Sequence, residues 1–177
     1  GDVEDVGDVV VPGAVRTVAT RSAEFGLPAD APEVDRRKRL AAWITDPTNP
    51  LFSRVMVNRL WHYHFGIGIV ETPSDFGFNG GRPSHPDLLD WLSTYFVNHG
   101  YSLKDMHRLI VTSATYRQGT RMMPSAHELD ANNRLLWRKT PMRLDAEALR
   151  DAMLHISGKL NPKKGGPGFE DVLIKYH

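Results

Sequence analysis

The segment from Leu51 to Phe65 carries apolar side chains on every side of a helix, and this feature constrains the fold more than any other. A helix that lies on the surface of a domain keeps one polar face. A helix that is apolar all round is therefore expected at the centre of a helical bundle. Gly66, a residue type that commonly follows the last helical turn, marks the expected end of the helix. The apolar set comprises Leu51, Phe52, Val55, Met56, Val57, Leu60, Trp61, Tyr63 and Phe65.

The rest of the chain also reads as mainly helical. Start and stop signals predict further helices over residues 35–45, 86–100, 102–117, 125–139 and 144–160. Residues 67–84 are rich in Gly and Pro and predict a loop, with room for a short strand at 67–70. The predicted fold is mainly α, an irregular helical bundle around the central helix at 51–65, with long loops and an extended N-terminal segment.

Residues 1–32 differ from the remainder. This segment holds four acidic residues before its first base at Arg16, and three prolines interrupt it. Val9–Val11 allow a short strand there. We interpret residues 1–32 as an extended lead-in, a linker or a disordered tail, and residues 33–177 as a helical domain.

The charge balance and the absence of cysteine exclude several classes of function. The chain has 22 basic and 21 acidic residues, a net charge of +1, which gives no general case for nucleic acid or an anionic membrane. The lack of cysteine excludes a cysteine nucleophile, a cysteine zinc site and covalent haem attachment in this chain. No run approaches 18 apolar residues, so no membrane span is expected.

Two of the predicted helices, over residues 86–117, are joined by a short turn at His99-Gly100-Tyr101, as in a helix-turn-helix. Residues 102–121 carry four basic side chains against one acidic side chain. DNA binding through Lys104, Arg108 and Thr112 is therefore one hypothesis, although any antiparallel helix pair can share such a turn.

Polar residues interrupt the central helix at i, i+4 and i+8. Arg54, Asn58 and His62 form this stripe, which fits a ligand-binding stripe or a buried structural network, and we favour the network. His62 and His64 lie about 200° apart on a helix and cannot hold one metal ion between them. No metal site is therefore predicted.

Carboxylates recur in two other places. Glu147, Asp151 and His155 share one face of the last helix and suit a divalent cation, acid–base chemistry or an ordinary solvated face. Asp75 and His85 flank the Gly-rich loop, which lacks the pattern of a phosphate-binding loop. We favour structural roles for both sets, and no GxSxG elbow is present.

A family resemblance rests on many ordered segments. They include Asn58-Arg59-Leu60-Trp61, Thr72-Pro73-Ser74-Asp75-Phe76-Gly77, Pro83-Ser84-His85-Pro86, Leu88-Leu89-Asp90-Trp91-Leu92, His107-Arg108-Leu109-Ile110, Ser113-Ala114-Thr115-Tyr116-Arg117, Asn133-Arg134-Leu135-Leu136-Trp137-Arg138 and Arg143-Leu144-Asp145-Ala146-Glu147. Together they resemble the planctomycete-specific domain of unknown function 1553 over about residues 36–168.

The resemblance implies a context rather than an activity. Such domains sit near the C-terminal end of large exported proteins of the cell envelope, after a c-type cytochrome-like domain. The family pattern continues past Gly168, so the resemblance implies that the C-terminal part of the domain is missing here. Any haem would belong to other domains of the parent protein, and no cofactor is expected in this chain. The polar residues within matching segments are the first candidates for a site: Arg59, Asp75, His85, His107, Arg143, Glu147, Arg150 and Asp151.

The expected function is a non-catalytic structural or interaction module of an exported, envelope-associated multidomain protein. Its expected partners are the other domains of the parent protein, with a polysaccharide as a further candidate. The alternative is an enzyme domain that acts on extracellular polysaccharide with Asp75, Glu147 and Asp151 as its carboxylates. DNA binding through residues 86–117 is the third hypothesis.

Overall fold

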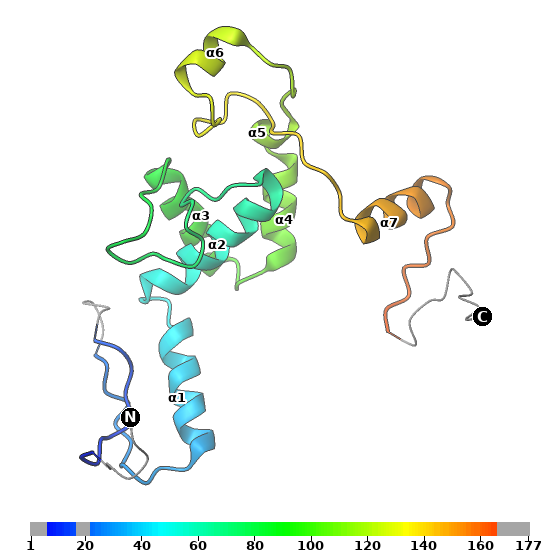
Figure 1. The fold of residues 1–177 in the computed structure, drawn as a ribbon. Helices are drawn as coiled ribbons and strands as arrows, with labels where there is room; N and C mark the ends of the chain where they lie inside the picture. The colour runs from blue at the N-terminus through cyan, green and yellow to red at the C-terminus, as the bar shows by residue number, and fades with distance from the viewer. Residues whose placement is uncertain (1–6, 17–21, 166–177) are drawn as a thin grey trace, which may run out of the picture. The chain divides into compact units, whose positions relative to one another are not determined.

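The computed structural model describes residues 7–16 and 22–165, and this part of the chain is mainly helical, as predicted (Figure 1). It divides into two compact units, residues 1–141 and residues 142–177. The described residues of the first unit contain α1 (Glu33–Thr45), α2 (Pro50–Phe65), α3 (Pro86–Asn98), α4 (Leu103–Thr112), α5 (Ala114–Arg117) and α6 (Pro124–Leu129). The second unit contains α7 (Ala146–Ile156). The predicted boundary between residues 32 and 33 stays a prediction.

The central helix forms where its sequence signals place it. The side chain of Asn49 caps α2 by accepting a hydrogen bond of 3.0 Å from the Leu51 amide, and Pro50 occupies the first turn. Gly66 ends the helix with a φ of 83°, and its amide donates to the His62 carbonyl. Both ends of α2 are therefore encoded locally.

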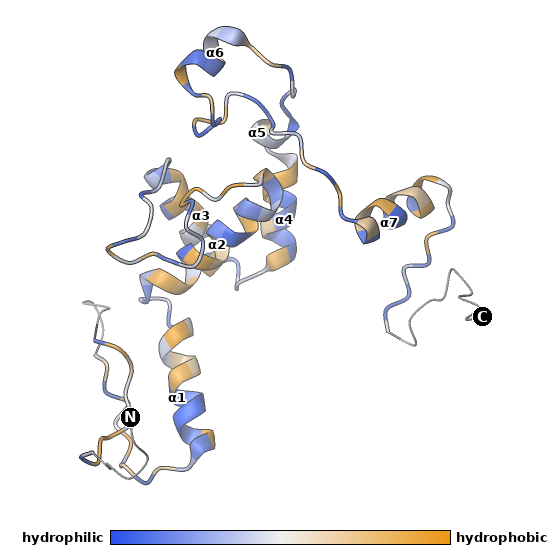
Figure 2. Ribbon diagram, viewed as in Figure 1, coloured by the Kyte–Doolittle hydropathy of each residue, from blue (hydrophilic) through white to orange (hydrophobic). Residues whose placement is uncertain are grey.

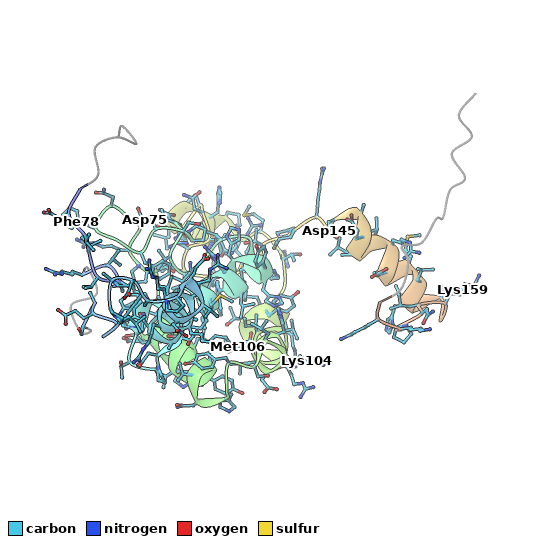
Figure 3. All side chains as sticks on the ribbon, turned by 90° about the horizontal axis from the view of Figure 1, so that it is seen from below. Asp75, Phe78, Lys104, Met106, Asp145 and Lys159 are labelled. Carbon is cyan, nitrogen blue, oxygen red and sulfur yellow. The ribbon has the colours of Figure 1, made fainter. Side chains whose placement is uncertain are left out.

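The core lies on one side of α2, where α3 and α4 pack against it. Met106 of α4 is fully buried there, and Figure 3 shows it among the packed side chains, whereas Lys104 lies at the outside. Burial of these apolar side chains is the main stabilising contribution to this unit. The buried core comprises Val57, Leu60, Trp61, Phe65, Ile69, Val70, Leu89, Leu92, Phe96, Met106 and Ile110.

The predicted strand at 67–70 is wrong, because a side chain takes the backbone groups that a strand partner would use. Asn58 is fully buried and forms two hydrogen bonds of 2.8 Å, one from the Val70 amide and one to the Val70 carbonyl. Gly68 passes so close to Asn58 that a Cβ atom at this position would lie 2.8 Å from both terminal atoms of the side chain. The segment is thus tied to α2 rather than to a sheet.

The predicted helix over 102–117 is interrupted at Ser113. This residue has extended backbone angles, and its hydroxyl donates to the Ile110 carbonyl while accepting from the Tyr116 amide. The serine therefore ends α4 and caps α5, an alternative hydrogen-bonding pattern that short hydroxyl side chains favour. Ser102 caps the start of α4, as expected.

The predicted helix over 125–139 is largely wrong, because only α6 forms. The Asp130 carboxylate accepts from the amides of Arg134 and Leu135, and the buried Asn133 side chain donates to the Arg138 carbonyl. Asn133 and Leu136 have φ angles of 54° and 60°, which are not helical. Turns held by these side chains replace the helix.

The described part of the lead-in is extended, and α1 follows it. The predicted strand at Val9–Val11 is wrong: these residues are exposed, and the nearest pairing is a single bridge between Gly13 and Glu24. The Trp43 indole of α1 donates to the Ser22 carbonyl at 3.0 Å. Figure 2 shows that α1 is hydrophilic in its first half and more hydrophobic toward α2.

In the second unit, α7 is shorter than the predicted 144–160. Asp145 caps it by accepting from the Ala148 amide at 2.7 Å. The helix ends at Ile156, and Gly158 follows with a φ of 70°, a conformation that glycine adopts without strain. Three apolar side chains on α7, Leu149, Met153 and Ile156, are exposed.

Candidate functional site

The core covers one side of α2 less fully than the rest, although Met56 on this side packs against core residues and the Phe52 ring lies 5.9 Å from the ring of Tyr101. Phe52, Val55, Met56, Arg59 and Tyr63 follow helical spacing and share this side, which we call the open face. Phe52, Val55 and Met56 are half-buried, Arg59 is exposed and Tyr63 is 74% exposed. The sequence correctly gives α2 apolar side chains all round, yet described elements cover the core side much more fully than the open face.

A pocket of about 340 Å³ opens on this face, where α1 meets α2. We call it the α1/α2 pocket. Seven of its nine lining residues are apolar, and these seven come from the lead-in, α1 and α2. The lining comprises Val15 of the lead-in, Trp43 and Ile44 of α1, Asn49 of the connecting turn, and Leu51, Phe52, Val55, Met56 and Arg59 of α2.

The two polar residues of the α1/α2 pocket have different roles. Asn49 is buried, and its side chain caps α2 and donates to the Trp43 carbonyl at 3.2 Å. Arg59, a candidate from the sequence, forms no hydrogen bond or ion pair with any residue that the structure describes. The pocket therefore presents one available guanidinium group beside an apolar surface, and no aspartate or glutamate is among its lining residues.

The polar stripe of Arg54, Asn58 and His62 is divided among separate partners. Arg54 forms an ion pair of 2.7 Å with Asp90 of α3, and Asn58 binds the Val70 backbone. The Nδ1 atom of His62 is buried and has no hydrogen-bond partner among the described residues. Arg54 and Asn58 therefore have structural partners, as the interpretation of the stripe as a structural network expects.

Pockets flank the Arg54–Asp90 ion pair. One of about 430 Å³ and one of about 360 Å³ both include these two residues in their lining. Ser53, Ser93 and Thr94 add hydroxyl groups to the larger pocket, and Val70 and Phe76 add apolar surface to the other. Neither includes Asp75, Glu147 or Asp151.

A histidine pair joins the end of α2 to α4. The Nε2 atom of His64 lies 2.8 Å from the Nδ1 atom of His107. The Lys139 ammonium group donates to the His64 carbonyl and lies over the rings of Phe65 and Tyr116, 4.9 and 4.7 Å from their centroids. The cluster therefore fixes the segment around Lys139 to the C-terminal end of α2.

Burial is the main reason that the pKa of His64 lies below its ordinary value, and the charges of His107 and Lys139 lower it further. Burial also lowers the pKa of Lys139. The N···N hydrogen bond needs one ring nitrogen as donor and the other as acceptor. These shifts match a packed, partly desolvated contact.

The structure does not join Asp75 to His85 by any described hydrogen bond. The Asp75 carboxylate accepts from the Gly77 amide at 2.8 Å, and its carbonyl accepts from the Thr72 hydroxyl. His85 precedes α3 and its Nδ1 atom lies 2.9 Å from the Ser84 hydroxyl. Figure 3 shows Asp75 beside Phe78 in the 66–85 loop, and Phe78 is fully exposed.

The remaining candidates, Arg143, Glu147, Arg150 and Asp151, belong to the second unit. Arg150 and Asp151 form an ion pair of 3.2 Å. Glu147 lies in the first turn of α7, where a carboxylate is favourable to the helix dipole. His155 lies in the last turn. Among the described residues no group of three or more His, Asp, Glu or Cys side chains is arranged to hold a metal ion.

Sequence reasoning missed Lys139 and Arg134. Arg134 donates to the carbonyls of Gly68 and Ile69 at 3.0 and 3.1 Å and lies 4.0 Å from the Glu71 carboxylate. The contact of Lys139 with His64 and the contacts of Arg134 with Gly68 and Ile69 join positions more than sixty residues apart. No local sequence pattern marks such pairs. The match of residues 133–138 to the family was the one signal available for Arg134.

The helix pair proposed for DNA binding is present as α3 and α4. Gly100 and Tyr101 in the connecting turn have φ angles of 62° and 59°. Lys104, Arg108 and Thr112 are exposed, as that hypothesis requires. None of the helices described is long and apolar enough to cross a membrane.

Comparison with known proteins gives one match. No curated protein and no solved structure matches the chain. A family model described as PSD1, protein of unknown function (DUF1553), matches residues 36–175. The match covers most of the chain and agrees with the resemblance carried by its motifs, and the chain therefore belongs to the DUF1553 family.

Proposed function

We propose that this chain is a non-catalytic interaction module of an exported, envelope-associated multidomain protein. In this proposal the module associates with other domains of its parent protein through the open face of α2. The observation that carries the proposal is the second apolar side of α2, which described elements leave accessible around Tyr63 and the α1/α2 pocket. Accessible apolar surface around a well-packed core is typical of an interaction site.

The enzyme alternative depends on Asp75, Glu147 and Asp151, and the structure describes each of them within its own unit. Asp75 lies in the first unit, with its carboxylate bound to a loop amide, whereas Glu147 and Asp151 lie on α7 of the second unit. A glycosidase needs two carboxyl groups about 5–10 Å apart across a cleft. No described pocket is lined by Asp75, Glu147 or Asp151, so the enzyme alternative gains no geometric support from the described residues.

Co-purification tests this proposal. The tagged 177-residue chain is expressed together with the remaining domains of its parent protein, and the complex is isolated through the tag. We expect the other domains to be retained and the substitution Tyr63→Glu to release them, because it places a charge on the open face. Tyr63 is largely exposed, so the substitution should leave the fold intact.

The matched control is Val111→Glu, which introduces the same charge at an exposed apolar residue of α4. Retention of the other domains by Val111→Glu and their loss with Tyr63→Glu supports the proposal. Equal retention by both variants contradicts it.

A further inference from the structure

The open face of α2 has the dimensions of a helix-binding surface. From Phe52 to Tyr63 it extends over eleven residue steps, about 16 Å at 1.5 Å per residue, or three helical turns. Its apolar residues follow one stripe, and Trp43 and Ile44 of α1 line the pocket that opens on it. A shallow apolar surface of this length suits an amphipathic helix that lies along it.

The positive charge available on the open face comes from a single residue. Arg59 lies in the middle of the stripe, and its guanidinium has no described partner, whereas the nearby Asn49 side chain is fully engaged. Arg54, five residues earlier and on another side of α2, is paired with Asp90. The only cation available on the open face is therefore Arg59, among the described residues.

A guanidinium beside an apolar pocket favours a carboxylate from the partner. The planar group accepts a carboxylate through two parallel hydrogen bonds, and such pairs are stronger where water is partly excluded. No acidic residue lines the α1/α2 pocket to compete for Arg59. An apolar helix without an acidic group would leave the guanidinium partly desolvated and unpaired, which is unfavourable.

We propose that the open face of α2 binds an amphipathic helix whose apolar stripe carries a neighbouring carboxylate, and that Arg59 pairs with this carboxylate. The inference rests on the proposed function and adds the chemistry of the partner. Phe52, Val55 and Met56 supply the apolar contact, and Arg59 selects acidic helices over neutral or basic ones.

Three synthetic helical peptides of about 16 residues test the inference with the complete 177-residue chain. They share one leucine stripe and differ only at the flanking positions, which are all Glu, all Gln or all Lys. Binding is measured by fluorescence anisotropy at low and at physiological salt. We expect the Glu peptide to bind at least tenfold more tightly than the Gln peptide, and the Lys peptide to bind most weakly.

Substitutions at Arg59 then test the assigned pair. Arg59→Glu should weaken the Glu peptide at least tenfold and strengthen the Lys peptide, while Arg59→Lys should retain part of the preference. Arg108→Glu makes the same charge change at an exposed arginine of α4 and should alter each affinity by less than twofold. Circular dichroism of each variant confirms that the helices remain.

The outcomes separate this inference from the function on which it rests. Equal binding of the Glu and Gln peptides, with both weakened by Tyr63→Glu, would overturn the role of Arg59 and leave the interaction function standing. If none of the peptides binds, the inference is overturned. The proposed interaction function is then still tested separately by the co-purification experiment. A dimer that Tyr63→Glu dissociates in analytical ultracentrifugation would assign the face to a second copy and also overturn the inference.

Discussion

The imidazole rings of His64 and His107 share a hydrogen bond of 2.8 Å between Nε2 of the first ring and Nδ1 of the second. The bond joins the last turn of α2 to α4, so the two helices are held together by polar contact as well as by the core. The Lys139 ammonium group binds the His64 carbonyl beside it. This cluster makes the stability of the first unit dependent on pH.

We expect the free energy of unfolding to fall as the pH is lowered through the range below about 6.5. The pKa of His64 is lower in the folded chain than in the unfolded chain, because of burial, His107 and Lys139. As the pH falls, His64 therefore binds a proton in the unfolded chain before it does so in the folded chain. The contribution of neutral His64 to stability is complete above the unfolded pKa and is lost as the pH falls through the folded pKa.

Denaturant unfolding between pH 8 and pH 5 checks this dependence. His64→Gln should reduce the slope of stability against pH, whereas His127→Gln, at an exposed histidine of α6, should not. An unchanged slope in the His64 variant would refute the assignment.

Asn58→Ala should destabilise the first unit by about 2–4 kcal/mol, since it leaves the amide and the carbonyl of Val70 without partners in a buried position. The melting temperature and the denaturant midpoint measure the effect. Asn98→Ala, at an exposed residue of α3, serves as the control and should change the stability by less than about 0.5 kcal/mol. A loss at Asn58 no larger than at Asn98 would contradict the structure.

Gly68→Ala should also be destabilising, by about 1–3 kcal/mol. An added Cβ would meet the Val70 carbonyl and lie 2.8 Å from the Asn58 amide group, so the backbone of this segment would have to move. Gly119→Ala is the matched substitution, because nothing lies within 4 Å of the added atom there. Thermal melts of the two variants should differ clearly, and coincident melts would show that the 67–70 segment accommodates the atom.

Arg134→Lys should weaken the attachment of the 130–140 segment by about 1–2 kcal/mol, because a single ammonium group cannot reproduce the forked contact with the carbonyls of Gly68 and Ile69. Hydrogen exchange should become faster at the amides of Asn133 and Leu136, which lie in the turns of that segment. Arg121→Lys, at an exposed residue, should leave those exchange rates unchanged. Unaltered exchange in the Arg134 variant would refute the role assigned to it.

Local signals predicted where the long helices lie and where α2 ends. Gly66 marked the end of α2 in the sequence, whereas the caps Asn49 of α2 and Asp145 of α7 were identified in the structure. Prediction failed where side chains bind backbone groups in place of secondary structure. Ser113 divides the predicted 102–117 helix, and Asn133 replaces the predicted helix beyond α6 with turns.

The candidate site was predicted only in part. Arg59 was a candidate because it lies in a segment that matches the family pattern. The apolar residues on every side of α2 were also visible in the sequence. Which side of α2 the core would cover depends on α3 and α4, which pack there through long-range contacts that helical periodicity does not specify. The pairing of His64 with His107, 43 positions apart, was beyond reach for the same reason.

The proposed interaction through the open face of α2 is measured most sharply by oxidative footprinting of the chain alone and of the multidomain protein to which we propose that it belongs. The method compares the modification rates of Met56 and Tyr63 in the isolated 177-residue chain and in the complete protein. We expect at least fivefold slower modification of Tyr63 in that multidomain protein, with Met56 also protected and the exposed Met123 unchanged. Equal modification of Tyr63 in both proteins would contradict the proposed interaction.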